Sequence, residues 1–421
     1  MDAAQLPEGR PSDPPAYLRL DGRVTRTTWG AGPGGPVIAD LPDSADPALD
    51  AHSAFGQSWL RGRRRPVVPA PTGRSLTLVD LFSGVGGLSL GVENAAWMLG
   101  RTTRSLLAAD MDLNVLNVYQ RNLNPKLSVS DPIETLIDGD LGVALTEAER
   151  YLSERLGRVD FLVAGPPCQG HSNLNNHTRR NDPRNLLYER VARAAEVLNP
   201  EHIIIENVPG VVHDQRNVVE RTKASLLKIG YSVDAGLIKA ELTGVAQRRR
   251  RYFVVASRTK TPSIQDAIAF GLTPCRPITW AVGDLTDQED GGPFDSSSGA
   301  AAVTKERMKY LFDNDLYDLP DSMRPACHRD KPHSYKSVYG RMYRDLPAPT
   351  ITSGFGTMGQ GRFVHPLEPR TLTPHEAARV QGLPDWFHFG GLSRTQLHKA
   401  IGNAVPPQMT SALAEHLLTL T

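Results

Sequence analysis

The fold is decided by the stretch Leu76-Thr77-Leu78-Val79-Asp80-Leu81-Phe82-Ser83-Gly84-Val85-Gly86-Gly87. Its apolar first half predicts a buried parallel strand, its glycines predict a tight turn, and residues 88–99 have the pattern of a helix. Together they predict the first strand–helix unit of a Rossmann-like sheet, where the backbone can approach a ligand at the helix N-terminus. The glycine spacing departs from G-x-G-x-x-G, so a dinucleotide is not indicated.

Further apolar runs predict neighbouring strands that end in polar residues. Residues 105–109 lead to Asp110, which predicts either a ligand for a ribose hydroxyl pair or a helix N-cap, with Asp112 nearer the cap. Gly139-Asp140-Leu141 offers a third strand-end acid, although by itself this stretch predicts a turn.

Residues 159–164 predict the strand that delivers Gly165-Pro166-Pro167-Cys168. A cysteine presented at a strand end by two prolines suggests a nucleophile, and an inert loop cysteine is the alternative. The buried run 202–205 delivers Glu206 and Asn207 to the same edge. An acid is costly to bury unpaired, so Glu206 is expected to be paired or functional, an N-cap being the alternative.

A run of arginines, Gln247-Arg248-Arg249-Arg250-Arg251, separates two predicted strands at residues 231–238 and 252–257, which suggest a hairpin. Strand alternation places Arg249 and Arg251 on one face and Arg248 and Arg250 on the other. One pair can therefore point into a site, while a solvated charged face is the simpler alternative.

The composition is that of an ordinary globular protein. The chain has 421 residues, 40% of them hydrophobic and 22% charged, with a net charge of +1, so any basic surface must be local. Three scattered cysteines indicate a reducing, cytoplasmic location rather than a disulfide framework. No apolar stretch is long enough for a bilayer, and the N-terminus lacks a signal-peptide pattern.

Three further stretches, residues 1–72, 258–344 and 372–382, differ in pattern from the predicted sheet. Residues 1–72 are rich in Pro and Gly and predict a flexible or lightly folded extension. Residues 258–344 are irregular, with aromatic and basic residues interleaved as in nucleic-acid contacts, and Cys327-His328 with His333 fits no standard metal site. Residues 372–382 predict a helix capped by Thr373.

The motifs, taken together, resemble the DNA cytosine-5 methyltransferase family of the bacterial restriction-modification or defence type. Five stretches match in the family's order: residues 80–87, 165–170, 206–208, 247–251 and 402–407. The resemblance covers the chain from about Leu76 to the C-terminus. The resemblance implies a Rossmann-like S-adenosylmethionine-dependent methyltransferase sheet with a smaller, irregular target-recognition domain. The implied division is an extension at 1–72, a catalytic domain at 73–258, a small domain at 259–394 and a C-terminal segment at 395–421 that returns to the catalytic domain.

The implied cofactor is S-adenosylmethionine. Residue-by-residue matching implies a site made of Phe82, Gly84, Gly86, Gly87, Asp110, Met111, Asp140, Leu141, Pro166, Leu187 and Asn403. Asp110 matches the family's ribose-binding acid, although Asp is shorter than the commoner Glu. Met111 stands where an aromatic residue is commoner.

The implied reaction transfers a methyl group to C5 of a cytosine flipped out of duplex DNA. Cys168 matches the nucleophile that adds to C6, Glu206 the group that protonates N3, and Arg249 and Arg251 the arginines that contact the base. Further base or DNA contacts are expected from Pro167, Gln169, Ser172, Asn207, Ser334, Tyr335, Lys336 and Arg341.

The resemblance also bounds the biological setting. A chain that acts as a monomer on DNA is expected, with no metal, no membrane and a cytoplasmic, nucleoid-associated location. It would mark self DNA beside restriction or phage-defence proteins. A solitary regulatory DNA methylase and a tRNA cytosine-5 methyltransferase are the alternatives, and the recognised DNA sequence does not follow from the resemblance.

Overall fold

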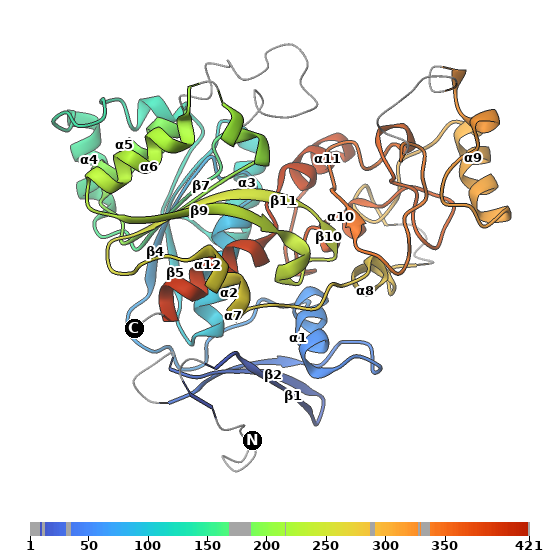
Figure 1. Cartoon of the computed structure of the whole chain (residues 1–421), viewed down its shortest axis with the longest axis horizontal. Coiled ribbons are helices and arrows are strands. Elements are labelled where there is room, and N and C mark those ends of the chain that lie inside the picture. Colours follow the sequence, from blue (N-terminus) through green and yellow to red (C-terminus); the bar gives the residue numbers. More distant parts are fainter. Residues whose placement is uncertain are drawn as a thin grey trace.

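A seven-stranded sheet in the order β6-β5-β4-β7-β8-β11-β9 organises the structure (Figure 1). The computed structural model describes residues 9–10, 13–30, 35–167, 187–214, 216–286, 291–326, 329 and 337–419. The strands of this sheet are β4 (Leu76–Leu81), β5 (Thr103–Ala109), β6 (Leu127–Val129), β7 (Phe161–Ala164), β8 (His202–Asn207), β9 (Ser232–Lys239) and β11 (Arg250–Ser257).

Five strands of the sheet are parallel, and two are not. β4 pairs in parallel with β5 and β7, β5 with β6, and β7 with β8. β11 runs antiparallel between β8 and β9, so the predicted hairpin is confirmed. Every residue of β4, β7 and β8 is buried, as expected for strands covered on both faces. The predicted α/β, Rossmann-like class is confirmed.

Helices cover the two faces of the sheet (Figure 1). One face carries α2 (Gly87–Met98), α3 (Leu113–Leu123), α7 (Ile264–Phe270) and α12 (Pro407–Thr419); the other carries α4 (Glu147–Leu156), α5 (Leu187–Leu198) and α6 (Val218–Lys228). Because side chains alternate between the two faces of the sheet, each strand contributes to the hydrophobic core on both sides. In β7, Phe161 and Val163 face α2 and α12, whereas Leu162 and Ala164 face α4, α5 and α6. The last helix, α12, packs along α2.

A smaller, mostly irregular region lies beside the sheet (Figure 1, right). It contains α8 (Ile278–Val282), α9 (Ala302–Asp313), α10 (Pro374–Val380) and α11 (Arg394–Asn403). The predicted cap of α10 is confirmed, because the Thr373 side chain accepts from the amide of Glu376 and the Glu376 side chain accepts from the amide of Thr373. Two short strands, β10 (Gln247–Arg248) and β12 (Ala348–Pro349), pair in parallel and join this region to the arginine run. The short 3-10 helices are η2 (Ile133–Thr135), η4 (Pro209–His213), η5 (Ala240–Thr243), η6 (Asp321–Met323) and η8 (Met358–Gln360).

The N-terminal residues differ from the flexible or lightly folded extension that their composition predicts. The described residues of this region form an antiparallel sheet of β1 (Ala16–Leu20), β2 (Arg23–Thr28) and β3 (Val37–Pro42), followed by α1 (Ala51–Leu60). Asp21 and Gly22, with φ of 52° and 70°, make the two-residue turn between β1 and β2. An Asp-Gly pair between two strands is a strong hairpin signal, and it is present in the sequence. Val24 and Trp59 join a core shared with the small region.

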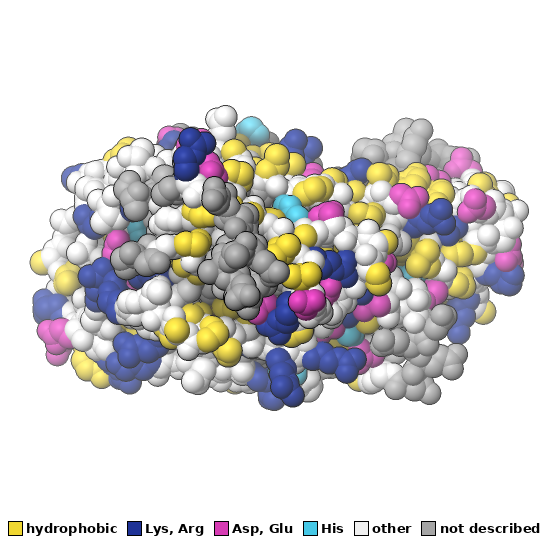
Figure 2. Space-filling view, turned by 90° about the horizontal axis from the view of Figure 1, so that it is seen from below, with side chains coloured by type: hydrophobic (Ala, Val, Ile, Leu, Met, Phe, Trp, Pro, Cys, Tyr) yellow, Lys and Arg dark blue, Asp and Glu magenta, His cyan; other side chains and the backbone are white. Residues whose placement is uncertain are grey.

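The surface carries charges of both signs. Figure 2 shows Lys and Arg side chains spread over the face seen from below, among acidic and apolar side chains. Within the described residues, no helix is both long and apolar enough to cross a membrane.

A buried ion pair connects the N-terminal sheet to the last helix. The Arg26 Nη2 atom lies 2.6 Å from Glu415 Oε1, and both side chains are less than 5% exposed. Arg26 also donates to the Thr28 hydroxyl. Because neither charge reaches water, each depends on the other for compensation.

The substitution Arg26→Met is therefore expected to lower the free energy of unfolding by about 3–5 kcal/mol, because it leaves the Glu415 carboxylate buried and unpaired. Arg23→Met is the matched control on the same strand: its pair with Asp40 is more than 40% exposed on both sides, and the loss should stay within about 1 kcal/mol. Urea unfolding measures both. Equal losses for the two variants would contradict a structural role for the buried pair.

Candidate active site

The carboxyl ends of β4, β5, β7 and β8 meet at one edge of the sheet, and the predicted site residues follow them. Phe82, Asp110 and Gly165 each come directly after their strand, and Glu206 and Asn207 are the last residues of β8. Ala164 of β7 pairs with Leu81 on one side and with Ile205 on the other. The residues expected to hold the cofactor and those expected to hold the base are therefore on adjacent strands.

The glycine turn after β4 depends on conformations and approaches that other residues resist. Phe82, Gly84 and Gly86 have φ of 58°, 53° and 95°, so the turn is left-handed at three positions, one of them a bulky residue. A Cβ on Gly87 would lie 2.2 Å from the Val405 carbonyl oxygen. The turn therefore lets the C-terminal segment lie directly against the start of α2.

Asp110 holds this turn from the neighbouring strand. Its Oδ2 accepts from the Gly84 amide and its Oδ1 from the Asp112 amide, both at 2.8 Å. Burial raises the pKa of Asp110 above its ordinary value. Asp112 is the N-cap of α3, as the sequence predicts, and it pairs with Lys399 at 2.7 Å.

Two other expected cofactor residues are open to solvent. Met111, next to Asp110, is 71% exposed. The Asp140 side chain is 86% exposed and lies 3.9 Å from Arg190. Asp140 lies between β6 and α4 rather than at a strand end, so the strand-end interpretation is wrong and the turn interpretation is right. Leu141 follows it in that turn, and Leu187 is the partly buried first residue of α5.

Glu206 and Arg251 form the central ion pair of the candidate site. Arg251 Nε lies 2.6 Å from Glu206 Oε1, and both side chains are at most 14% exposed. Burial raises the pKa of Glu206, and the charges of Arg251 and Arg249 oppose this effect. A Cβ on Gly165 would lie 3.8 Å from Glu206 Oε2, so this carboxyl group lies beside the start of the Pro-Pro segment.

Arg249 is almost fully buried, 1% exposed, and its guanidinium reaches three backbone carbonyls. Nη1 donates to Ile351 at 2.8 Å, and Nη2 donates to Gly402 and Ala404 at 3.2 and 3.1 Å. Arg248 and Arg250 are exposed, so the predicted alternation of the arginine run is confirmed. The donors of Arg249 hold the two carbonyls that flank Asn403, which is itself exposed at the end of α11.

Gln247 extends this connection between the sheet and the small region. Its Nε2 donates to Val380 O and to Gln381 Oε1, and its Oε1 accepts from the Ile351 amide. Sequence reasoning missed Gln247 and Gln381 as positioning residues. The available signal was the glutamine in each of two predicted elements, residues 247–251 and 372–382, although nothing local in the sequence pairs them.

Asn207 and Arg341 do not occupy the DNA-facing positions expected of them. Asn207 is 2% exposed; its Nδ2 donates to Pro166 O at 3.3 Å, so it holds the Pro-Pro segment against β8. Arg341 is 9% exposed, donates twice to Pro366 O and lies 3.9 Å from the centre of the Phe312 ring. Both polar groups are occupied within the fold because burial demands partners for them.

Several predicted residues lie outside the described part of the chain: Cys168, Gln169, Ser172, Ser334, Tyr335 and Lys336. Their assigned roles stay predictions. Pro166 is buried and Pro167 partly buried, and they are the last described residues before Cys168.

The role of Arg249 in joining the two regions can be tested by stability. Arg249→Met removes the donors for three buried carbonyls, so the free energy of unfolding should fall by at least about 2 kcal/mol. Arg248→Met, at the adjacent exposed position, should change it by less than about 0.5 kcal/mol. Chemical unfolding of the two variants measures the difference. If the Arg249→Met protein is as stable as the Arg248→Met protein, Arg249 does not join the two regions.

The chain is similar to known proteins in its family pattern, its sequence and its fold. The family model described as C-5 cytosine-specific DNA methylase matches residues 76–419. The Type II methyltransferase M1.BsuMI of Bacillus subtilis (strain 168) is 49% identical over 367 residues, which cover 87% of this chain and 86% of that protein.

Two solved structures are similar in fold. The Dnmt2 methyltransferase of S. pombe superimposes with a TM-score of 0.59 at 18% identity, and the methyltransferase EhMeth of Entamoeba histolytica with 0.56 at 19%. Each comparison covers 82% of this chain and 98% of the other. At these identities the likeness concerns the fold alone.

Proposed function

Since the chain belongs to the C-5 cytosine-specific DNA methylase family, we propose that it methylates C5 of a flipped cytosine in duplex DNA through Cys168. The observation that carries this proposal is the buried pair of Glu206 and Arg251, 2.6 Å apart, beside the Gly165-Pro166-Pro167 segment that leads to Cys168. A buried acid with a raised pKa at such an edge suits proton transfer to a ring nitrogen.

The glycine turn fits the cofactor that the family uses, S-adenosylmethionine. Gly84 leaves open space at the turn, and Asp110 lies beside it with a carboxylate suited to ribose hydroxyls. Gly86 and Gly87 let the turn pack closely against Leu123 and Val405. The exposed Met111 side chain is available to pack on a flat ring. When bound, this cofactor supplies a methyl group carried on a positively charged sulfur.

In the proposed reaction, the Cys168 thiolate forms a bond to C6 of cytosine, and the electron pair of the C5–C6 double bond moves toward C5 and N3. Glu206 gives its proton to N3, so the ring becomes a neutral enamine whose C5 accepts the methyl group. A base then removes the C5 proton, the bond from Cys168 to C6 breaks as the double bond re-forms, and N3 returns its proton to Glu206.

Arg251 and Arg249 have different roles in the proposed reaction. Arg251 orients the Glu206 carboxyl group and is the arginine available to approach the O2 edge of the base. Arg249 acts as a positioning residue, because its donors hold the backbone on both sides of Asn403. Asn207 likewise positions Pro166.

The proposed setting is a restriction-modification or phage-defence system in the cytoplasm, with the chain acting as a monomer that marks self DNA. The relative from Bacillus subtilis is a Type II methyltransferase by name, which supports this setting over a solitary regulatory methylase.

The experiment that tests the function is base-resolution mapping of 5-methylcytosine in a bacterium that lacks cytosine methylation and expresses the full chain. One methylated sequence motif is expected, and it should be absent with Cys168→Ser, because a hydroxyl is a poor nucleophile toward C6. Unmethylated DNA from cells that contain folded, cofactor-binding protein would refute the proposal. Methylated tRNA in the same cells would support the RNA alternative instead.

The proton-donor role predicts a pH dependence. If transfer needs protonated Glu206, the methyl-transfer rate falls as pH rises through a pKa that burial has raised above the ordinary value for Glu. Glu206→Gln should lower the rate by about 100-fold or more and remove this dependence, while cofactor binding is kept.

Glu201→Gln is the matched control for this measurement. Glu201 precedes β8 at the opposite end of the strand and pairs with Arg158 at the surface. The control should keep both the rate and its pH profile. A pH profile that is unchanged in Glu206→Gln would exclude Glu206 as the titrating group.

A further inference from the structure

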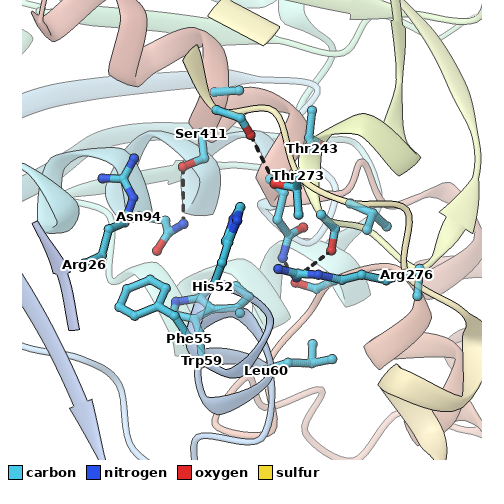
Figure 3. A pocket seen from close by; sticks show the side chains of 18 of the residues that line it. Arg26, His52, Phe55, Trp59, Leu60, Asn94, Thr243, Thr273, Arg276 and Ser411 are labelled. Carbon is cyan, nitrogen blue, oxygen red and sulfur yellow. Dashed lines mark hydrogen bonds between the residues drawn. The ribbon is translucent and has the colours of Figure 1, made fainter. Parts of the chain in front are cut away.

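A cavity of about 110 Å³ lies between the N-terminal sheet, α1, α2, α12 and the segment that follows α7 (Figure 3). None of the predicted catalytic or cofactor residues lines it. Its walls are aromatic on one side, with Tyr17 stacked on His52 at 4.1 Å and Phe55 and Trp59 beside them. Part of the cavity is built by residues 17–60, which precede the region that matches the family model.

Arg276 points its guanidinium into this cavity (Figure 3). The residue is 7% exposed and its guanidinium carbon lies 4.1 Å from the centre of the Trp280 ring. Nη1 donates to the Gly244 carbonyl at 3.0 Å. Within the described part of the chain, Nε is buried without a hydrogen-bond partner, and no carboxylate forms a salt bridge with the group. Burial lowers the pKa of Arg276 to about 10, so it remains a cation at neutral pH.

The other two arginines of the cavity wall are paired. Arg26 contacts Glu415, and Arg379 contacts Asp284 and Asp385, each at 2.6 Å. His52 adds no charge at neutral pH, since burial and the nearby Arg276 lower its pKa to about 4. Arg276 is therefore a buried positive charge that no described carboxylate contacts directly, although the charge of Asp50 acts on it, and such a cation is costly unless a ligand compensates it further.

The fold makes room for this cation. A Cβ on Gly56, in the middle of α1, would lie 2.4 Å from Arg276 Nη1, so the helix carries a glycine where the guanidinium passes. Glycine inside a helix is unfavourable, so the space it leaves requires a reason. Asn94 Oδ1, Gln408 Oε1 and Trp280 Nε1 are buried in residues that line the cavity, also without partners among the described residues.

We propose that this cavity is a binding site for a small carboxylate that bears a single aromatic ring. Its carboxylate would take two N–H donors from Arg276, the geometry that guanidinium and carboxylate prefer. Its ring would lie among the aromatic side chains of the opposite wall. A few polar groups at one end of an apolar cavity are the usual composition of a small-molecule site. At about 110 Å³ the cavity is smaller than the cavities of about 150 Å³ that hold a benzene ring in other proteins, so its lining must move to admit one ring.

The site adjoins the arginine run. Residues 243–246 line the cavity and lead directly into Gln247 and Arg249. Gln408, on the opposite wall, donates to the carbonyl of Gly382, which follows the partner of Gln247. An occupied cavity would therefore stabilise the segment that positions Arg249. Binding itself does not depend on the proposed methylation, so it is tested separately.

Isothermal titration of the full chain with sodium benzoate tests the proposal, with benzamide and inorganic phosphate as probes that lack the charge or the ring. Benzoate is expected to bind with a Kd of about 1 mM or lower, and the two other probes at least about tenfold more weakly. Arg276→Gln should weaken benzoate binding by at least about tenfold. Arg63→Gln, at an exposed position, should leave it unchanged.

Ala412→Phe is a second variant, which fills the cavity while keeping Arg276, and it should abolish benzoate binding. A cooperative urea unfolding transition serves as the folding check for both variants, and Ala412→Phe carries the test if Arg276→Gln does not fold. The proposal is overturned if benzoate does not bind the intact chain, if benzamide or phosphate binds equally well, or if the folded Ala412→Phe protein binds as tightly as the original.

Discussion

One buried guanidinium holds together the parts of this molecule that must cooperate. Arg249 leaves the end of the sheet and donates to the carbonyls of Ile351, Gly402 and Ala404. A buried carbonyl that loses its donor is destabilising, so the small region and the C-terminal segment have one preferred position relative to the sheet. Val405, next along that segment, places its carbonyl against Gly87. The backbone of residues 402–405 thus links the shape of the glycine turn to the position of Arg249.

Two opposed effects act on the pKa of Glu206 in its pair with Arg251. Burial favours the neutral carboxylic acid, whereas the neighbouring guanidinium favours the carboxylate, and burial is the larger effect on the pKa. The strand register fixes the geometry: Phe253 of β11 lies opposite Glu206 of β8, so Arg251, two residues earlier, projects on the same face. An acid held in this balance can change protonation state without large movements of the backbone.

The sequence alone predicted the elements whose signals are local. The buried strands, the glycine turn, the hairpin of β9 and β11 and the cap of α10 each follow from a contiguous pattern, and the structure has them. The N-terminal sheet was missed because β1 is only partly buried and its alternation is weak, although Asp21-Gly22 marked the turn. The positions of Asn207 and Arg341 could not be predicted, because the partners that bury them, Pro166 and Pro366, are distant in sequence.

The ion pair of Arg26 and Glu415 also affects how the chain is made. The two residues are separated by 389 positions, so at roughly 5–20 residues per second the ribosome needs roughly 20–80 s to produce the second after the first. The N-terminal hairpin can form early from its own turn, but its Arg26 must stay hydrated until α12 arrives. Burial of the first strands is therefore one of the last folding events. A chain cut short before α12 would leave Arg26 without its partner and the N-terminal sheet without the helix that completes its packing.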